Sequence, residues 1–339
     1  MPCCAECFGD WGLRKNIPLM SDDVGTCSYC ATENVSIIAP PLLSEYFELL
    51  ISAYREDRDG KTLVEWFRDD WGLFEHPRMD STRANELLAQ ILNDEDISRR
   101  RYLPVYRSEV NSLQQWENLR HELMYRNRFF PAVEIDRGRL EALLFSLAMD
   151  RGEVPGLWYR GRIQISDEPF IADQMGAPPP RTASHGRANP AGIPYLYLGS
   201  TQQTAICEIR PHTGELVCVA EFRVAENLTL VDLRMPRKTV SPFLLEGGEE
   251  IGRMRNDLPF LARLGDELTR PVIPQTAAID YTPTQYLCEF IKKCNYDGLV
   301  YRSSVGEGIN LALFNPEAAG CGTITQHRVN RVSVESEPI

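Results

Sequence analysis

Apolar residues recur three or four positions apart between residues 41 and 150, and this spacing predicts helices. Asp and Ser near the segment starts, as in "MDSTRANE", are typical N-caps. A succession of such segments favours a helical bundle. The expected helical segments are 42–56, 61–71, 83–94, 110–130 and 139–149.

The pattern changes after "RGEVPG" (151–156), where short runs of β-branched and aromatic residues begin. These runs predict strands, and two amphipathic segments, 201–211 and 282–295, predict helices between them. The second half is therefore expected to be an α+β domain built on a sheet. Residues 234–275 predict an irregular or partly helical insertion. The expected strands are "LWYRGRIQI", "PYLYLG", "LVCVAEFRV", "LTLVDL", "GLVYRS" and "INLALF".

Cysteines are concentrated at the N-terminus, within residues 1–36. Cys4-x-x-Cys7 and Cys27-x-x-Cys30 are separated by nineteen residues, a spacing that can bring four thiolates to one tetrahedral zinc. A segment this short has little core of its own, so a metal would supply its folding energy. Four sulfur ligands leave no open position, which indicates a structural site. Cys3 can replace Cys4 in the set, and free or redox-active cysteines are the alternative.

Charge and composition exclude several classes. The chain has 339 residues and a formal net charge of −12, whereas nucleic-acid binding needs a basic footprint. No stretch approaches the roughly 20 apolar residues of a membrane span, and the first residues lack the pattern of a signal peptide. Ten cysteines without a secretion signal indicate a reducing compartment, so we expect a cytoplasmic protein.

Residues suited to bind an anion and a flat ring lie in the strand zone. Arg160 and Arg162 alternate along one strand and therefore share a face. Guanidinium groups make bidentate contacts with phosphate, although a solvated polar face explains the pair equally well. Arg187 adds a third guanidinium in a glycine-bearing loop. Tyr197 can stack on nicotinamide or adenine, although a strand tyrosine is more often part of the core.

A carboxylate and a hydroxyl-rich loop complete the candidate chemistry. Glu208 lies within the most apolar part of "STQQTAICEIRP", where it either faces solvent or is desolvated and functional. The stretch "YRSSVGEGINLALF" supplies Ser303, Ser304 and Asn310. Its two glycines predict a tight turn before a buried strand.

Two common catalytic motifs are absent from the sequence. There is no G-x-S-x-G elbow, and His185 and His212 have no evident acid partner, so a Ser-His-Asp hydrolase is poorly supported. The "VGEG" turn is followed by no G-K-[ST], so it is not a phosphate loop.

Taken together, the motifs "WYRGRI", "GRANPAGIPYLYLGSTQQTAICEIRP", "LVDL", "YTPTQYLCEFIKKCNYDGLVYRSS" and "GINLALF" resemble the RES domain family. The resemblance covers roughly residues 155–320, and the motifs occur in the family's order. It implies an ADP-ribosyltransferase-like fold with a split, mixed sheet that grips NAD+. It also implies cleavage of NAD+ at the nicotinamide–ribose bond, with phosphate or water as acceptor, by a toxin of the toxin–antitoxin or antiphage defence type.

The resemblance carries roles to particular residues. It makes Glu208 the group that stabilises the developing ribose cation, with Arg160 and Ser303 beside it as catalytic residues. Arg187 is expected at the phosphates, Tyr197 on the nicotinamide and Asn310 at the ribose or amide. Arg162 and Ser304 are neighbours of lower rank. The long gap between Glu208 and Ser303 indicates an insertion.

The first two zones resemble, more weakly, the HEPN-like domain that precedes some RES domains. HEPN domains that cut RNA carry an Arg and a His a few residues apart on one helix. His76 lies too far from Arg68, and His121 directly follows Arg120, so a non-nucleolytic role in assembly or sensing is expected.

The expected organisation is a zinc-binding segment over 1–36, a helical HEPN-like domain over 37–152 and a RES catalytic domain over 153–339. The leading hypothesis is an NAD+ phosphorylase or glycohydrolase with a structural zinc. The alternatives are a protein ADP-ribosyltransferase and a non-catalytic zinc and helical interaction module. Expected partners are an antitoxin or regulatory protein and further copies of the chain.

Overall fold

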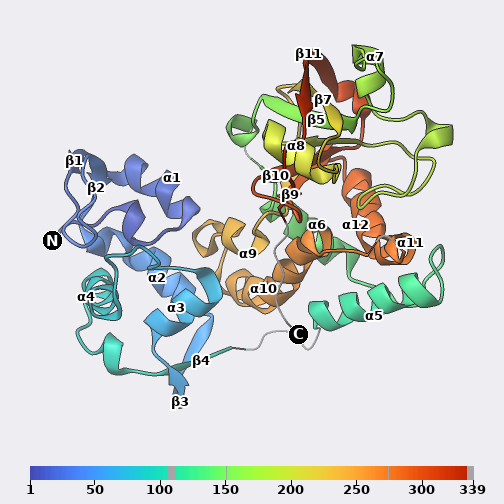
Figure 1. The fold of residues 1–339 in the computed structure, drawn as a ribbon. Coiled ribbons are helices and arrows are strands. Elements are labelled where there is room, and N and C mark those ends of the chain that lie inside the picture. Colours follow the sequence, from blue (N-terminus) through green and yellow to red (C-terminus); the bar gives the residue numbers. More distant parts are fainter. Residues whose placement is uncertain (106–110, 150, 274, 334–339) are drawn as a thin grey trace. The chain divides into compact units, whose positions relative to one another are not determined.

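The computed structural model describes residues 1–105, 111–149, 151–273 and 275–333 (Figure 1). The chain forms two compact units. The first combines Met1–Leu113 with Arg237–Leu261, and the second combines Gln114–Pro236 with Ala262–Ile339. This division differs from the expected boundaries, because residues 114–149 of the expected helical domain belong to the second unit, whereas residues 237–261 of the insertion belong to the first.

Short helices and two small antiparallel sheets, β1–β2 and β3–β4, make up the first unit. Thr62 starts α3 with a capping box, since its Oγ1 accepts from Glu65 N and Glu65 Oε2 accepts from Thr62 N at 2.8 Å. Asp80 caps α4, as "MDSTRANE" predicts, by accepting from Arg83 N at 2.9 Å. The elements are η1 (Ala5–Cys7), α1 (Trp11–Met20), β1 (Asp23–Gly25), β2 (Val35–Ile37), η2 (Pro40–Leu43), α2 (Ser44–Ile51), β3 (Tyr54–Lys61), α3 (Leu63–Trp71), α4 (Ser81–Leu92), η3 (Ile97–Arg99) and β4 (Tyr102–Pro104), with α9 (Pro236–Thr239) and η6 (Pro242–Leu244) from the insertion.

The predicted helices do not form one bundle. Helices α2 to α4 lie in the first unit, whereas α5 (Ser112–Tyr125), from Gln114 onward, and α6 (Arg137–Ser146) lie in the second. In the second unit, Trp116 Nε1 of α5 donates to Glu267 Oε1 at 3.3 Å. Helical periodicity predicts that α5 buries one face, but it does not predict which segment that face contacts. The predicted helix 42–56 also ends early, because the chain from Tyr54 pairs with β4 instead.

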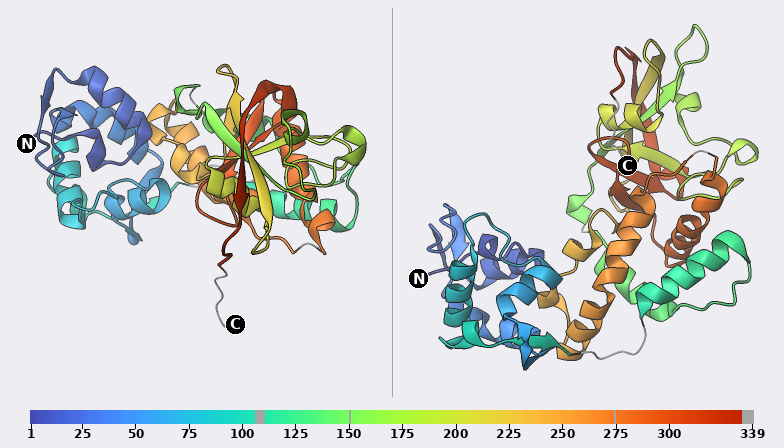
Figure 2. Two further views of the ribbon diagram at one scale, coloured as in Figure 1. Left: turned by 45° about the horizontal axis from the view of Figure 1, so that its top comes forward. Right: turned by 60° about the horizontal axis from the view of Figure 1, so that its bottom comes forward.

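A seven-stranded mixed sheet, in the order β11–β7–β5–β6–β10–β9–β8, organises the second unit. All neighbouring strands are antiparallel except β8 and β9. The strands twist relative to one another (Figure 2), and all the predicted strands are confirmed. Their bounds are β5 (Leu157–Ile163), β6 (Leu196–Gly199), β7 (Leu216–Val224), β8 (Leu230–Asp232), β9 (Gly298–Arg302), β10 (Ile309–Leu313) and β11 (Ala319–Arg328).

Helices of the second unit connect these strands. The predicted helices 201–211 and 282–295 are present as α8 (Gln202–Glu208) and α12 (Thr282–Lys293). Helix α8 packs on β5 and β6. The remaining elements are η4 (Arg151–Glu153), α7 (Ala172–Met175), η5 (Pro180–Thr182), α11 (Ala277–Asp280) and η7 (Pro316–Ala318).

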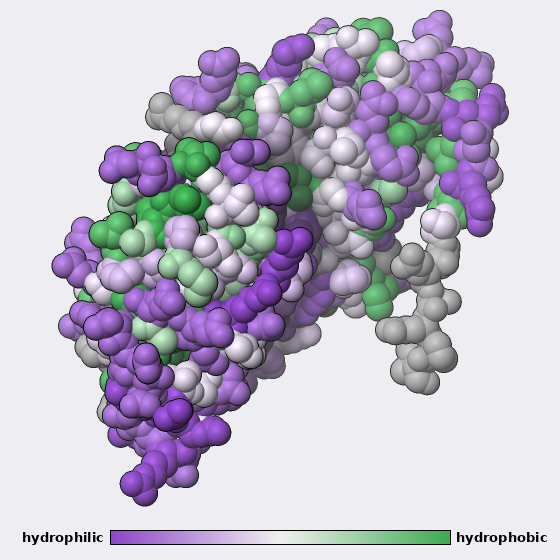
Figure 3. Space-filling view, turned by 90° about the vertical axis from the view of Figure 1, so that its left-hand side faces the viewer, coloured by the Kyte–Doolittle hydropathy of each residue, from purple (hydrophilic) through white to green (hydrophobic). Residues whose placement is uncertain are grey.

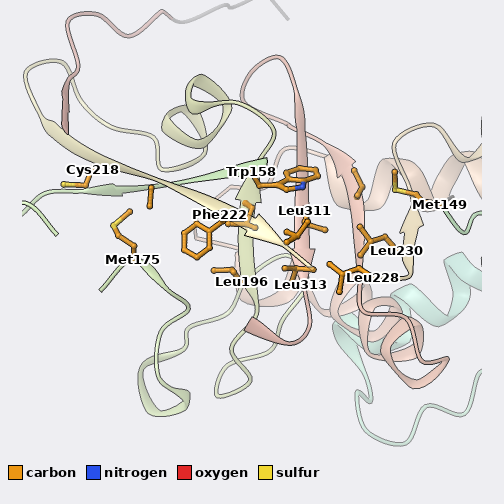
Figure 4. Packing of buried hydrophobic residues seen from close by; sticks show 14 residues of the cluster. Met149, Trp158, Met175, Leu196, Cys218, Phe222, Leu228, Leu230, Leu311 and Leu313 are labelled. Carbon is orange, nitrogen blue, oxygen red and sulfur yellow. The ribbon is translucent and has the colours of Figure 1, made fainter. Parts of the chain in front are cut away.

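A hydrophobic core lies along one face of the sheet (Figure 4). Trp158, Phe222 and Leu311, from three different strands, are buried there, and so is Met149, which follows α6. Met149 N donates to Leu230 O at 2.9 Å, which ties the end of the α6 segment to β8. Alternation along each strand therefore directs the neighbouring residues, Tyr159 among them, to the opposite face.

Strand β11 and helix α10 (Gly248–Thr269) are among the elements that the sequence patterns do not predict. Strand β11 is an edge strand that pairs only with β7, so it is largely exposed and carries no apolar run. Helix α10 occupies the segment expected to be irregular. It contains Pro259, which obscured its periodicity, because proline usually ends or kinks a helix. The helix begins in the first unit and ends in the second.

Polar residues dominate the surface turned to the viewer in Figure 3, with hydrophobic residues gathered in small patches. This distribution agrees with the charged fraction of the sequence, which is 25%. Among the described residues, no helix combines the length and the apolar composition needed to cross a bilayer.

Candidate active site

The sheet opens between β5 and β6, and a cavity of about 290 Å³ lies at this opening. The two strands share only one register pair, Tyr159 with Gly199. The walls include residues of β5, β6, α8, β9, β10 and the 186–187 loop. The lining residues are Tyr159, Arg160, Gly161, Gly186, Arg187, Tyr197, Leu198, Gly199, Ala205, Glu208, Ile209, Arg210, Tyr281, Tyr301 and Asn310.

One row of residues runs across four strands and lines this cavity. Tyr301 pairs with Asn310, Asn310 with Gly199, and Gly199 with Tyr159. Residues at paired positions point to the same face of a sheet, so all four face α8. Gly199 makes room for this helix, because a Cβ there would lie 2.8 Å from Ala205 N.

Glu208 is held at the end of α8. The helix starts at Thr201, whose Oγ1 accepts from Thr204 N at 3.0 Å, and ends at Glu208. Glu208 Oε1 accepts two hydrogen bonds, from Ser303 Oγ at 2.7 Å and from Asn310 Nδ2 at 2.6 Å. None of the described residues donates to Oε2. The carboxylate is therefore oriented by one oxygen while the other remains available to a ligand.

Arg160 places a desolvated guanidinium in the cavity wall. Its Nη1 donates to Tyr197 O at 2.9 Å, its Nε is buried without a partner, and it forms no ion pair with a described carboxylate. Burial, and to a smaller extent the positive charge of Arg162, lowers the pKa of Arg160 to about 10. A buried cation without a counter-ion is a site for an anionic ligand.

Arg187 is positioned from three sides. Its Nη2 donates to Ser304 Oγ at 2.8 Å, its Nη1 donates to Arg270 O at 2.7 Å, and its guanidinium lies 5.6 Å from the ring centroid of Tyr281. No ion pair joins it to a carboxylate in the described part of the chain. Arg160 and Arg187 thus give the cavity a positive wall around Glu208.

Tyr197 lines the cavity, but its hydroxyl serves the neighbouring loop. It donates to Asn189 Oδ1 at 2.7 Å and accepts from Ala188 N at 3.0 Å. A Cβ on Gly186 would lie 2.5 Å from the same hydroxyl, so this glycine allows the loop to approach. The expected stacking of Tyr197 on nicotinamide stays a prediction.

The structure gathers Glu208, Arg160, Arg187, Tyr197 and Asn310 around the cavity. Ser303 and Ser304 do not line it, but each contacts one of these side chains: Ser303 Oγ donates to Glu208, and Ser304 Oγ accepts from Arg187.

Arg162 does not join the site, contrary to its expected role. Its Nη1 donates to Gln174 O at 2.5 Å, and its guanidinium lies 5.7 Å from the ring of Phe170. Arg162 shares a strand face with Arg160, but its guanidinium contacts residues in and near α7 and does not line the cavity.

Four polar residues of the lining, Tyr159, Arg210, Tyr281 and Tyr301, are among those that the sequence analysis does not single out. Tyr301 lies two residues before Ser303, so strand alternation was the available signal. Tyr159 and Tyr281 flank motifs that drew attention to their arginines. Arg210 follows Glu208 and adopts a left-handed backbone with φ of 49°, a conformation that composition alone does not reveal.

Four sulfur atoms meet in the first unit, as predicted. The Sγ atoms of Cys4, Cys7, Cys27 and Cys30 all lie within 4.8 Å of one another, and all four residues are buried. A tetrahedral Zn–S₄ site places its sulfurs about 3.8 Å apart, so the cluster fits this metal. Cys3 lies outside the group; its backbone pairs with Ile38 instead.

Comparison with known proteins identifies the second unit. None of the curated proteins compared matches the chain. The crystal structure of the M. tuberculosis MbcT–MbcA toxin–antitoxin complex aligns with 56% of this chain and 92% of that one, at 15% identity and a TM-score of 0.32, too low to support an assignment by itself. The model of the RES domain matches residues 159–331, which is half of the chain and includes the whole cavity wall. The chain therefore belongs to the RES domain family.

Proposed function

We propose that the second unit cleaves NAD+ at the bond between nicotinamide and ribose. One observation carries this proposal: Glu208, oriented by Ser303 and Asn310, lines a cavity together with two arginines. Neither Arg160 nor Arg187 forms an ion pair with a carboxylate among the described residues. A dinucleotide with a positive reacting end and a doubly charged pyrophosphate complements this arrangement of one negative and two positive groups.

The chemistry needs few groups. Departure of nicotinamide leaves an oxocarbenium-like cation on the ribose, and the free Oε2 of Glu208 can stabilise that charge. The leaving group is already a cationic pyridinium, so it departs as neutral nicotinamide without a general acid. This agrees with the absence of histidine from the cavity lining.

The arginines suit the phosphates. Arg160 and Arg187 can each donate to pyrophosphate oxygens, with charge-assisted hydrogen bonds that gain strength where water is excluded. Tyr197 and Tyr281 line the same space and offer faces for an aromatic ring.

The acceptor distinguishes three reactions. Attack by phosphate at the ribose carbon yields an ADP-ribose phosphate ester, attack by water yields ADP-ribose, and attack by a protein side chain yields a modified protein. We favour the small acceptors, phosphate or water, in line with the family resemblance. Protein ADP-ribosylation is the alternative, and a mass increase of a co-purified protein would support it.

Zinc is proposed as a structural partner of the first unit. Cys4, Cys7, Cys27 and Cys30 would hold it as four thiolates, and the metal would supply folding energy to a segment with little core. No catalytic step depends on it, because a four-sulfur site has no open position.

Cleavage of NAD+ must be kept in check in the cell that contains the enzyme. An enzyme that destroys NAD+ inside a cell harms that cell, so we propose a toxin or defence effector held in check by an antitoxin, by self-assembly or by the first unit. The HEPN-like character of that unit stays a prediction.

The test is release of nicotinamide from NAD+ by the purified full chain, measured by chromatography with and without inorganic phosphate. We expect release, with an ADP-ribose phosphate ester appearing only when phosphate is present if phosphorolysis operates. A wild-type protein that leaves NAD+ intact in both conditions would refute the proposal.

A further inference from the structure

Tyr301 is a buried residue that the proposed reaction leaves without a role. It lies on β9, is 4% exposed, and lines the cavity. Its hydroxyl makes no hydrogen bond to any described residue. Unlike the hydroxyl of Tyr195, it is not among the sealed polar atoms of the structure, so it is reachable from the cavity, where a ligand can accept its hydrogen bond.

The hydroxyl of Tyr301 is a donor under ordinary conditions. Burial raises the pKa of Tyr301 well above its usual value, and the neighbouring Tyr197 and Glu208 act in the same direction. The phenol therefore stays protonated throughout the physiological range and can donate to an oxygen in the cavity.

Asn310 offers the complementary group directly across the strand pair. It is 4% exposed and lies opposite Tyr301 in the β9–β10 register, where side chains of paired residues come within about 5 Å. A carboxylate oxygen only accepts, so Asn310 must direct Nδ2 to Glu208, as it does at 2.6 Å. Its Oδ1 receives no hydrogen bond from the described residues, and because Asn310 lines the cavity, this oxygen is available to a ligand as an acceptor.

We propose that Tyr301 and Asn310 together recognise the carboxamide of the nicotinamide ring. The Tyr301 hydroxyl donates to the carboxamide oxygen, and Asn310 Oδ1 accepts from the carboxamide nitrogen. This pairing rests on the proposed function and deepens it, because it makes Tyr301 a specificity-determining residue. It also places the scissile bond beside Glu208, since Asn310 contacts both groups.

A primary carboxamide matches this pair better than a carboxylate does. A carboxylate, as in the nicotinic acid dinucleotide, would bring a negative oxygen against Asn310 Oδ1 and close to Glu208. We therefore expect the site to select nicotinamide over nicotinic acid, whose ring is otherwise the same.

The variant Tyr301→Phe tests the proposal without disturbing the fold. The hydroxyl has no partner in the described structure, so its removal should leave Tm unchanged or slightly higher. Tyr195→Phe is a matched control: Tyr195 is 1% exposed, its hydroxyl is buried without a partner, and it does not line the cavity.

Substrate selectivity is the first measurement. We compare kcat/KM for NAD+ with that for the analogue in which unsubstituted pyridine replaces nicotinamide. The electronic effect of losing the carboxamide is common to wild type and variant, so the change in the ratio reports the hydrogen bond. We expect Tyr301→Phe to reduce the preference for NAD+ by about three- to tenfold, and Tyr195→Phe to leave it unchanged. An unchanged ratio in Tyr301→Phe overturns the proposal.

Binding of free nicotinamide, measured by calorimetry on the full chain, separates this inference from the proposed reaction. Wild type should bind nicotinamide about three- to tenfold more tightly than Tyr301→Phe does, and should bind nicotinic acid more weakly. If wild type binds nicotinamide in this manner but leaves NAD+ intact, the proposed reaction fails and carboxamide recognition stands. If wild type cleaves NAD+ while Tyr301→Phe binds nicotinamide equally well, recognition fails and the reaction stands.

Discussion

Ser303 Oγ donates a hydrogen bond of 2.7 Å to Glu208 Oε1, although the two residues are 95 positions apart in the chain. Ser303 follows β9, and Glu208 ends α8, so the contact joins the sheet to the helix that covers it. Ser304 makes the parallel contact to Arg187. Adjacent serines thus orient the two opposite charges of the cavity, and their separate removal should have separate effects.

Ser303→Ala should lower kcat for NAD+ by about tenfold to a hundredfold. A hydrogen bond to a charged group contributes about 1.5–3 kcal/mol, and its loss frees the Glu208 carboxylate to leave its working orientation. Steady-state nicotinamide release measures the effect. Ser304→Ala is the matched control, and we expect it to raise KM through Arg187 with little change in kcat. Equal effects of both variants on both constants would contradict this division of roles.

Arg160→Met should weaken ADP-ribose binding by about tenfold or more, because a charged hydrogen bond to phosphate is lost. Calorimetry with the full chain measures it. Arg162→Met, two residues along β5 and outside the cavity lining, should leave affinity unchanged. Equal weakening by Arg162→Met would show that the cavity wall is assigned incorrectly.

The pH dependence of ADP-ribose binding follows from the same arginine. Burial lowers the pKa of Arg160 to about 10, so its charge is present below that pH and is lost above it. A cation whose pKa falls on folding destabilises the folded state while it is charged, and that penalty diminishes as the pH rises from about 10 towards the ordinary pKa of arginine. Affinity should therefore be flat near neutrality and fall as the pH passes about 10. Affinity that persists well above pH 10 would contradict the lowered pKa of Arg160, while the Arg160→Met variant tests its role as a phosphate ligand independently of pH.

Gly199→Ala should reduce activity strongly, because its Cβ would lie 2.8 Å from Ala205 N and displace α8, and with it Glu208. Gly320→Ala is the control: Gly320 lies on β11 of the same sheet, and a Cβ there meets nothing within 4 Å. Nicotinamide release and Tm are measured together. Retained activity in a folded Gly199→Ala protein would show that α8 need not lie this close to β6.

Zinc should be present at about one ion per chain, and a strong chelator should lower Tm by releasing it. Metal analysis of Cys7→Ser should find less zinc, whereas Cys3→Ser, also buried but outside the sulfur group, should retain it. Zinc well below one per chain in freshly purified wild type, or equal loss in both variants, would argue for free cysteines.

Much of the second unit could be predicted because its strands carry local signals. "LVCVAEFRV" coincides with β7 in full, and the Thr-Pro start of "TPTQYLCEFIKKCN" marks α12. The site residues Glu208, Arg160 and Arg187 could be named because their motifs occur in the order of a known family. Cys4, Cys7, Cys27 and Cys30 could be grouped because paired spacing alone restricts which sulfurs can meet.

The remainder depends on contacts between distant segments. No local pattern indicates that Trp116 of α5 contacts Glu267, so the sequence predicted a single helical bundle. Arg162 was expected at the cavity because strand alternation predicts the face on which a side chain lies. Alternation does not predict that Gln174 and Phe170 contact the side chain on that face. Tyr301 was missed because its role depends on the register between β9 and β10, which is a property of the folded sheet.

Nicotinamide release from NAD+ by wild type and by Glu208→Gln is the most direct test of the central claim. Gln keeps the size of the side chain and an oxygen for Ser303 and Asn310, but it removes the negative charge that we assign to the ribose cation. We expect the variant to lose about a hundredfold or more in kcat while it still binds ADP-ribose, which shows that it is folded. Equal release by the two proteins, or none by wild type, would contradict the claim.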